Sequence, residues 1–434
     1  MAIPDWTVEL LKRQINDIAV QLKNPESIHH LRQRAMEFLH DLPQTASRFW
    51  EQAREGGAFS SVPVYLSSAS VLNASGNFCG GPVVGAPVRS SVIHAGVLDW
   101  NHFRLEQEHQ SSIQHELSKF ATQVGADDCL VSNGWDASCA AVAALATQRG
   151  GRLFLPRCCA TKLPSGRLIP EALGAAADVV EVGAVDGVDA QQWQRLSLQS
   201  NDTIVFTDRI DQACLPGPNL GGLLVQLAPH ATLHPLSGCN ETPPSLSGLL
   251  SAGIQLVVTS AAGWLGGPAC GLIFGPRSEL QSLRECSLWP ALQANVTVQS
   301  MATAALAERS PLHDFLEVSL ENLQHRAQHL STRLAACAPT EGGCIAECLI
   351  TDEAARLAEG QPFWVPSRQL ALRHATLAAK DWAASLLRQQ PAVLADVQDD
   401  RLVVDLRWID AGQDAALAQA LGAKPEFLDE QDVP

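Results

Sequence analysis

Short apolar runs alternate with alanine- and leucine-rich stretches between about residues 65 and 330. Seven runs are candidate strands: 129–132, 152–155, 179–182, 203–206, 223–226, 254–258 and 271–274. The stretches between several of them, such as 136–148 and 245–252, have helical composition. Strands that are apolar along their whole length and alternate with helices are typical of a mostly parallel sheet covered on both faces. The pattern therefore predicts an α/β domain.

The flanking regions have different patterns. Apolar residues recur at helical spacing within residues 4–57, and a leucine stripe over residues 314–337 predicts one long helix. Two apolar runs joined by Asp399-Asp400 predict a hairpin near the C-terminus. We expect an N-terminal helical segment over residues 1–62, a large domain over residues 63–330 and a small C-terminal α+β domain over residues 331–434.

Composition excludes several classes of protein. The chain has 46 acidic against 30 basic residues and a formal charge of −16, which opposes a broad nucleic-acid surface because such surfaces neutralise phosphates. No apolar run approaches the roughly 20 residues that span a bilayer, and the N-terminus lacks a signal-peptide pattern, so we expect a cytoplasmic protein. Twelve cysteines occur without a C-x-x-C pair, and we therefore expect buried thiols and no metal site.

Three stretches carry a family resemblance. Val71-Leu-Asn-Ala-Ser-Gly is similar to V-I-N-A-T-G, and residues 249–274 resemble a stretch that reads L-A-A-G-x-D-L-V-x-F-S-G-D-K-L-L-G-G-P. Asp399-Asp-Arg-Leu-Val-Val-Asp-Leu-Arg407 resembles D-D-R-L-L-L-D-L-R, and Arg167-Leu-Ile-Pro170 adds to the match. These motifs resemble those of bacterial selenocysteine synthase (L-seryl-tRNA selenium transferase) and its relatives. The resemblance implies a fold-type-I pyridoxal-phosphate enzyme with a large, mostly parallel domain and a small C-terminal α+β domain.

The sequence departs from this family where chemistry is expected. Gly263 stands where the family has the lysine that forms a Schiff base with pyridoxal phosphate, and Ala262 replaces the preceding acid. A glycine has no amine to offer the cofactor. Gln226 stands where the family has the aspartate that pairs with the pyridine nitrogen, and a neutral amide can only hydrogen-bond there.

The expected phosphate-binding residues are altered as well. Asn133 and Gly134 match a family turn that leads into a helix N-terminus, a natural anion site, but bulky Trp135 and acidic Asp136 follow. Residues 107–112 match an arginine-containing family stretch and contain no arginine. Gly266 and Gly267 are retained and predict a tight turn, with or without a phosphate.

Other side chains could still carry chemistry. Lys162 lies in a loop that approaches the cofactor in this fold, so it is either a relocated Schiff-base lysine or a solvated loop residue. Arg407, like Arg401, could bind a substrate carboxylate or pair with nearby aspartates. Cys158 and Cys159, beside Arg157, could include a thiol of lowered pKa or simply pack. One further local group could either bind zinc or consist of ordinary loop residues: His230, His234 and Cys239.

The resemblance and the departures together predict a selenocysteine-synthase-like pseudoenzyme. We expect it to act as a structural or regulatory subunit in a homodimer, a higher homo-oligomer or a complex with an active relative. The alternative is an active pyridoxal-phosphate lyase or transferase with a relocated lysine or a non-covalently held cofactor. Selenocysteine synthesis on seryl-tRNA is a third interpretation, which the acidic charge and Gly263 oppose.

Overall fold

The computed structural model describes most of the chain after residue 70. The described residues are 71–80, 85–101, 103, 105–163, 166–174, 176–210, 214, 221–336 and 345–422. The larger of two compact units of the chain runs over residues 71–410 and 416–434, and the contacts given below lie inside it. The helices predicted over residues 4–57 lie outside the described residues.

A seven-stranded sheet forms the larger α/β part, in the strand order β3-β9-β8-β7-β6-β4-β5. Its strands are β3 (Asp128–Ser132), β4 (Leu153–Pro156), β5 (Val179–Val182), β6 (Thr203–Thr207), β7 (Leu223–Leu227), β8 (Leu256–Ser260) and β9 (Gly271–Gly275). Six of the strands run in the same direction, and β9 runs opposite to them between β3 and β8. All seven predicted strands and the mostly parallel sheet are confirmed.

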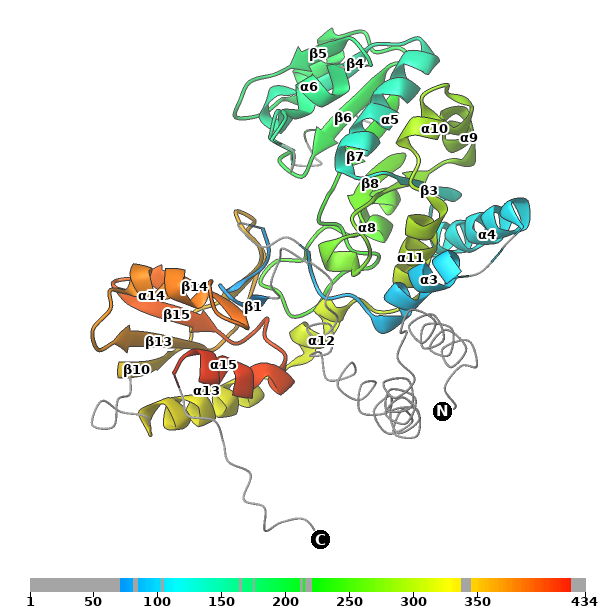
Figure 1. The fold of residues 1–434 in the computed structure, drawn as a ribbon. Helices are drawn as coiled ribbons and strands as arrows, with labels where there is room; N and C mark the ends of the chain where they lie inside the picture. The colour runs from blue at the N-terminus through cyan, green and yellow to red at the C-terminus, as the bar shows by residue number, and fades with distance from the viewer. Residues whose placement is uncertain are drawn as a thin grey trace, which may run out of the picture. The chain divides into compact units, whose positions relative to one another are not determined.

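Nine described helices precede, alternate with or follow the strands of this sheet, and several of them pack on it (Figure 1). They are α3 (Ser90–Asn101), α4 (Glu106–Val124), α5 (Trp135–Arg149), α6 (Ile169–Gly174), α7 (Ala190–Arg195), α8 (Leu246–Ser251), α9 (Arg277–Glu285), α10 (Trp289–Leu292) and α11 (Val296–Ala307). Helix α5 contacts β3, β8 and β9, while α11 packs on α3 and α4. The core between these elements is made of side chains with no solvent exposure, such as Phe154, Ile204 and Phe274.

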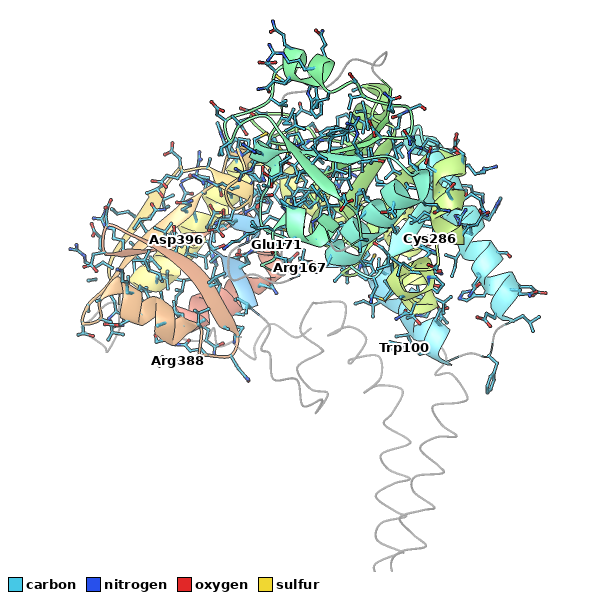
Figure 2. All side chains as sticks on the ribbon, turned by 90° about the horizontal axis from the view of Figure 1, so that it is seen from above. Trp100, Arg167, Glu171, Cys286, Arg388 and Asp396 are labelled. Carbon is cyan, nitrogen blue, oxygen red and sulfur yellow. The ribbon has the colours of Figure 1, made fainter. Side chains whose placement is uncertain are left out.

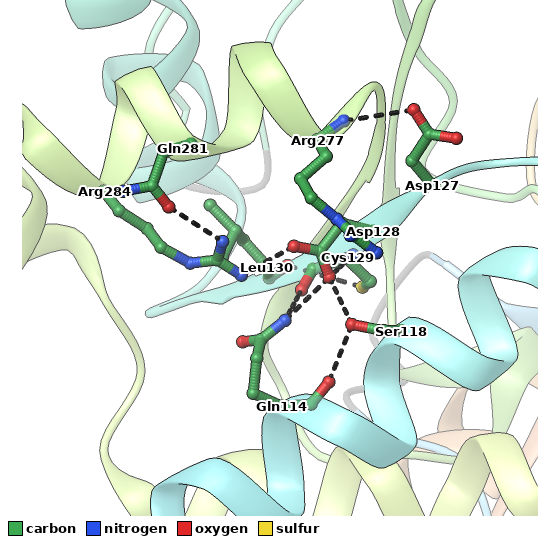
Figure 3. A network of polar contacts seen from close by, with 9 residues as sticks. All are labelled: Gln114, Ser118, Asp127, Asp128, Cys129, Leu130, Arg277, Gln281 and Arg284. Atoms are coloured by element: carbon green, nitrogen blue, oxygen red, sulfur yellow. Dashed lines mark hydrogen bonds and ion pairs between the residues drawn. The ribbon is translucent and has the colours of Figure 1, made fainter.

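A buried carboxylate ties α4, β3 and α9 together (Figure 3). Asp128 accepts hydrogen bonds from Ser118 Oγ at 2.7 Å and Gln114 Nε2 at 2.8 Å, and it pairs with Arg284 Nη2 at 2.8 Å. Burial by itself would raise the pKa of Asp128, but the hydrogen bonds from Ser118, Arg284 and the amide of Cys129 together lower the pKa below its ordinary value. Asp128 is therefore ionised in the folded protein, and its bonds hold α4, β3 and α9 together.

The C-terminal part contains a five-stranded sheet in the order β1-β14-β15-β13-β10 and a three-stranded sheet in the order β12-β11-β2. The strands are β1 (Val71–Ala74), β2 (Asn77–Cys79), β10 (Ile345–Thr351), β11 (Ala355–Ala358), β12 (Trp364–Val365), β13 (Gln369–His374), β14 (Ala392–Gln398) and β15 (Arg401–Asp405). In the described residues after 345, the helical elements are α14 (Ala379–Leu386), the 3₁₀ turn η7 (Ala411–Gln413) and α15 (Asp414–Ala420).

The predicted hairpin is confirmed as β14 and β15, which pair antiparallel around Asp399 and Asp400. Both turn residues have positive φ, at 47° and 57°, the geometry that two-residue hairpin turns require. Strand β1 pairs parallel with β14, and β2 pairs parallel with β11, although both precede the large sheet in the chain. The domain boundaries at residues 62 and 330 stay a prediction.

The single helix predicted over residues 314–337 is wrong. The chain forms α12 (Pro311–Glu317) and α13 (Leu320–Ala335), with Val318 and Ser319 in extended conformation between them. Ser319 Oγ accepts the amide of Asn322 at 3.1 Å and thereby caps the second helix. The leucine stripe could not reveal this break, because the apolar face of α13 continues the helical spacing.

Candidate functional site

The carboxyl ends of parallel strands gather the candidate residues at one edge of the large sheet. β4 is followed by the 3₁₀ turn η2 (Arg157–Cys159), and β8 is followed by the 3₁₀ turn η5 (Gly263–Leu265). β6 leads into Asp208, while β7 contains Gln226 and leads into His230. Ligands of open α/β sheets bind at this edge, so the described residues here form the candidate site.

Gln226 lies near the end of β7 and is 4% exposed. Its strand neighbours are Phe206 of β6 and Val257 of β8. The Oε1 atom of Gln226 is buried and has no hydrogen-bond partner among the described residues. An unsatisfied buried carbonyl costs about 1–3 kcal/mol, so this oxygen is an acceptor that a donor from a ligand or a water molecule would stabilise.

His230 packs against the turn that follows β8. Its ring lies 5.2 Å from that of Trp264, with an angle of 36° between the planes. Burial lowers the pKa of His230, and the negative charge of Asp208 only partly opposes this effect. The imidazole is therefore neutral near pH 7. Trp264 is held in turn by its Nε1, which donates to the Leu357 carbonyl at 3.3 Å.

Gly263 opens η5 with a φ of +74°. A β-carbon at this position would lie 3.0 Å from the Sγ atom of Cys79, a residue of β2 that the sequence did not single out. Burial raises the pKa of the Cys79 thiol to about 12, so the sulfur is neutral. The turn after β8 therefore has a residue without a side chain, Gly263, next to the protonated thiol of Cys79.

Gly266 and Gly267 form the tight turn that the sequence predicts. The amide of Gly266 donates to the Gly263 carbonyl at 3.1 Å, and the amide of Gly267 donates to the Ala261 carbonyl at 2.8 Å. A β-carbon on Gly266 would lie 2.8 Å from Pro311 Cδ, and one on Gly267 would meet Ala261 at 3.0 Å. Close packing is sufficient reason for both glycines.

Lys162 is exposed, and its backbone forms an isolated bridge with Leu168. The loop is fastened by Arg167, whose Nη2 donates to the Glu171 carbonyl at 3.2 Å; both residues are labelled in Figure 2. Near the same edge, Cys159 is fully buried and its Sγ accepts the amide of Thr207 at 3.3 Å. Burial raises the pKa of Cys159 to about 11, so this thiol packs and is not activated.

The residues matched to the phosphate-binding motifs lie together. Asn133 and Gly134 form the turn between β3 and α5, and Gly134 has a φ of +93°. A cavity of about 760 Å³ is lined by Asn133 together with Glu106, His109 and Gln110 of α4. The turn and the arginine-free stretch 107–112 thus meet in one cavity, and no lysine or arginine is among its lining residues in the described part of the chain.

The zinc-site alternative is not supported by geometry. His230, His234 and Cys239 are all described, and within the described residues no three histidine, cysteine or acidic side chains group as metal ligands. Cys239 instead borders an apolar cluster that contains Trp264 and Phe363.

Arg407 is buried, with 4% of its surface exposed. Its guanidinium donates to three backbone carbonyls, those of Phe315 at 3.1 Å, Val318 at 2.6 Å and Pro366. Arg401 pairs with Glu347 at 3.0 Å on the surface of the hairpin. These contacts favour the structural alternative for both arginines, and the substrate role of Arg407 stays a prediction.

The family model for L-seryl-tRNA selenium transferase matches residues 232–410. An L-seryl-tRNA(Sec) selenium transferase of Moorella thermoacetica is 25% identical over 410 residues, covering 88% of this chain and 85% of that protein. Its counterpart in Carboxydothermus hydrogenoformans is 22% identical and covers 69% of this chain and 68% of that protein.

Among solved structures, D-glucosaminate-6-phosphate ammonia-lyase aligns with a TM-score of 0.58 and 16% identity, over 82% of this chain and 95% of that chain. At this identity the likeness concerns the fold alone, which is that of the fold-type-I pyridoxal-phosphate enzymes. Among the described helices, none is long and apolar enough to cross a membrane.

Proposed function

The chain is selenocysteine synthase-like, and from this premise we propose that it no longer forms the covalent bond between a lysine and pyridoxal phosphate. It acts instead as a structural or regulatory subunit of a homo-oligomer, or of an oligomer with an active relative. The proposal depends on the edge of β8, where the matched family motif has its lysine and this chain has Gly263.

The surroundings of Gly263 support this interpretation. The positive φ suits glycine and strains any other residue, and Cys79 Sγ lies in close contact with the place of a β-carbon. A lysine here would therefore carry backbone strain of about 1–2 kcal/mol and would have to displace the Cys79 thiol slightly. The residues at this position do not fit a covalently held pyridoxal phosphate.

Lys162 is the candidate for a relocated Schiff-base lysine at this edge of the large sheet, and it is exposed. Schiff-base lysines of enzymes are activated by desolvation or by a neighbouring cation. The Lys162 side chain is open to solvent, in a loop fastened by backbone bonds. We therefore interpret Lys162 as a solvated loop residue and not as a Schiff-base lysine.

Borohydride trapping tests the loss of covalent chemistry. The purified protein is incubated with pyridoxal phosphate, reduced and mapped by peptide mass spectrometry, beside the Lys162→Met variant and a surface control, Lys380→Met. We expect no stoichiometric adduct in any sample. A stoichiometric adduct that disappears only in Lys162→Met would establish the relocated-lysine alternative.

Light scattering tests the subunit role, alone and after mixing with an active relative from the same host. We expect a dimer or larger assembly. A monomer under both conditions contradicts the proposed role.

One observation favours the second candidate, a non-covalently held cofactor. Gln226 Oε1 is a buried acceptor without a partner among the described residues, at the strand end where ligands of this fold bind, and it suits a protonated ring nitrogen. Equilibrium dialysis with pyridoxal phosphate tests this candidate. Binding that is lost in Gln226→Leu and retained in Lys162→Met supports it, whereas equal binding by both variants and the wild type contradicts it.

Both relatives named above are L-seryl-tRNA(Sec) selenium transferases. For this chain we propose that no tRNA is bound, because a net charge of −16 opposes the phosphate contacts that dominate such affinity. A filter-binding titration with seryl-tRNA over a series of salt concentrations should give no retention, and salt-sensitive retention would overturn this part of the proposal.

A further inference from the structure

The cavity beside the β3–α5 turn is built from three separate segments of the chain. Asp99 of α3, Glu106 and His109 of α4, and Asn133 of the turn line it together with Gln293 and Gln299 from the region of α10 and α11. Its volume of about 760 Å³ falls in the range of small-molecule sites. Nothing in the proposed subunit role requires this polar cavity.

Gln299 contributes an oriented amide to the lining of the cavity. The residue is 9% exposed, and its Nε2 donates to the Ala294 carbonyl at 2.7 Å. Its Oε1 accepts no hydrogen bond from the described residues and is accessible to solvent. The amide is therefore fixed in orientation by one bond while its acceptor remains available in the cavity lining.

The charges of the lining are acidic. Asp99 Oδ1 lies 3.0 Å from His109 Nε2, and the Asp99 side chain is 3% exposed. Glu106 is exposed, and its Oε1 accepts a weak hydrogen bond from Gln110 Nε2 at 3.3 Å. Two carboxylates thus face the cavity with one imidazole as the single basic group among its described lining residues.

This chemistry restricts the occupant. Like-charge repulsion disfavours a phosphate, even though the turn leads into the N-terminus of α5. A metal ion is disfavoured, because Asp99, Glu106 and His109 do not group as ligands within the described residues. An amine can pair with Glu106, and hydroxyl groups can use the amides of Asn133, Gln293 and Gln299 as both donors and acceptors.

We propose that this cavity binds a small molecule that carries a primary amine and several hydroxyl groups and has no phosphate. The proposal goes beyond the subunit role. An amino sugar is the simplest probe of this class.

Titration calorimetry on the full-length protein tests the site with three matched probes: glucosamine, glucose and glucosamine 6-phosphate. We expect one glucosamine to bind per chain and the other two probes to bind at least roughly tenfold more weakly. Glucose lacks the amine that pairs with Glu106, and glucosamine 6-phosphate adds a phosphate that the carboxylates repel. No binding of glucosamine, or tighter binding of either other probe, overturns the proposal.

Variants locate the site. Glu106→Gln should weaken glucosamine binding roughly tenfold. Glu108→Gln, in the same first turn of α4 but outside the lining, should leave the affinity unchanged. Gln299→Leu should weaken binding up to roughly tenfold, because it removes one acceptor, and should lower the melting temperature slightly, because it also removes the bond to the Ala294 carbonyl. Equal affinities of the Glu106 variant and wild type would refute the assignment, even if the Gln299 variant fails to fold.

Discussion

The Sγ atom of Cys79 lies 3.0 Å from where a β-carbon on Gly263 would stand. The contact joins β2, which pairs with the C-terminal strand β11, to the turn that follows β8 of the large sheet. At this separation a side chain on Gly263 and the thiol compete for the same space. If Gly263 matches the family's lysine, as we propose, the Cys79 thiol would have to move to admit that side chain.

Restoring a side chain at Gly263 should destabilise the protein. Gly263→Ala is expected to cost about 2–3 kcal/mol in urea unfolding, since positive φ strain of about 1–2 kcal/mol adds to the contact with Cys79. Gly150→Ala is the matched control, because Gly150 has a φ of +71° and open space around it. Equal losses in the two variants would show that the thiol does not matter.

Gly263→Lys alone should fail to trap pyridoxal phosphate under borohydride. Adding Cys79→Ala should recover part of the lost stability, because it removes the competing sulfur. Peptide mass spectrometry and urea unfolding measure the two effects. A full adduct in the single variant would contradict the steric explanation.

Asp128 should give stability that depends on pH. Its folded-state pKa is lowered, so its contribution is complete above the unfolded value of about 4 and is lost as pH falls through the folded pKa. Asp128→Asn should cost about 2 kcal/mol at pH 7 and progressively less below pH 4. Exposed Asp127→Asn is the control and should change stability little at any pH. The free energy of unfolding across this pH range decides between these outcomes.

His230 should destabilise the fold in mild acid. Its folded-state pKa is lowered mainly by burial, so no penalty exists above the unfolded value of about 6.5, and stability falls as pH drops from there toward the folded pKa. His230→Gln should flatten this part of the unfolding profile. Exposed His234→Gln should leave it unchanged. A wild-type slope in both variants would contradict the assignment to His230.

Arg407→Lys should destabilise the protein by about 2–4 kcal/mol, because an ammonium cannot serve the carbonyls of Phe315, Val318 and Pro366 in the same geometry. Arg401→Lys, in a half-exposed pair with Glu347, should cost less than about 1 kcal/mol. Denaturant unfolding compares the two. Wild-type stability of the Arg407 variant would argue for a ligand-binding role instead.

Local patterns in the sequence were enough to predict the strands of the large sheet and the C-terminal hairpin. Continuous apolar runs identified the seven strands, since both faces of a mostly parallel sheet are buried, and Asp399-Asp400 identified the hairpin. The glycine at position 263 is given by the sequence alone, whereas its match to the family's Schiff-base lysine stays a prediction.

Contacts between side chains that are distant in the sequence became visible in the folded protein. Cys79 and Gly263 are far apart in the chain, and so are His109 and Gln299, so no local pattern could pair them. The break at Val318 and Ser319 was hidden for a similar reason, because Arg407, almost 90 residues later, binds the carbonyls exposed there. Spacing reports the local conformation of the backbone, whereas long-range packing selects the neighbours of each side chain.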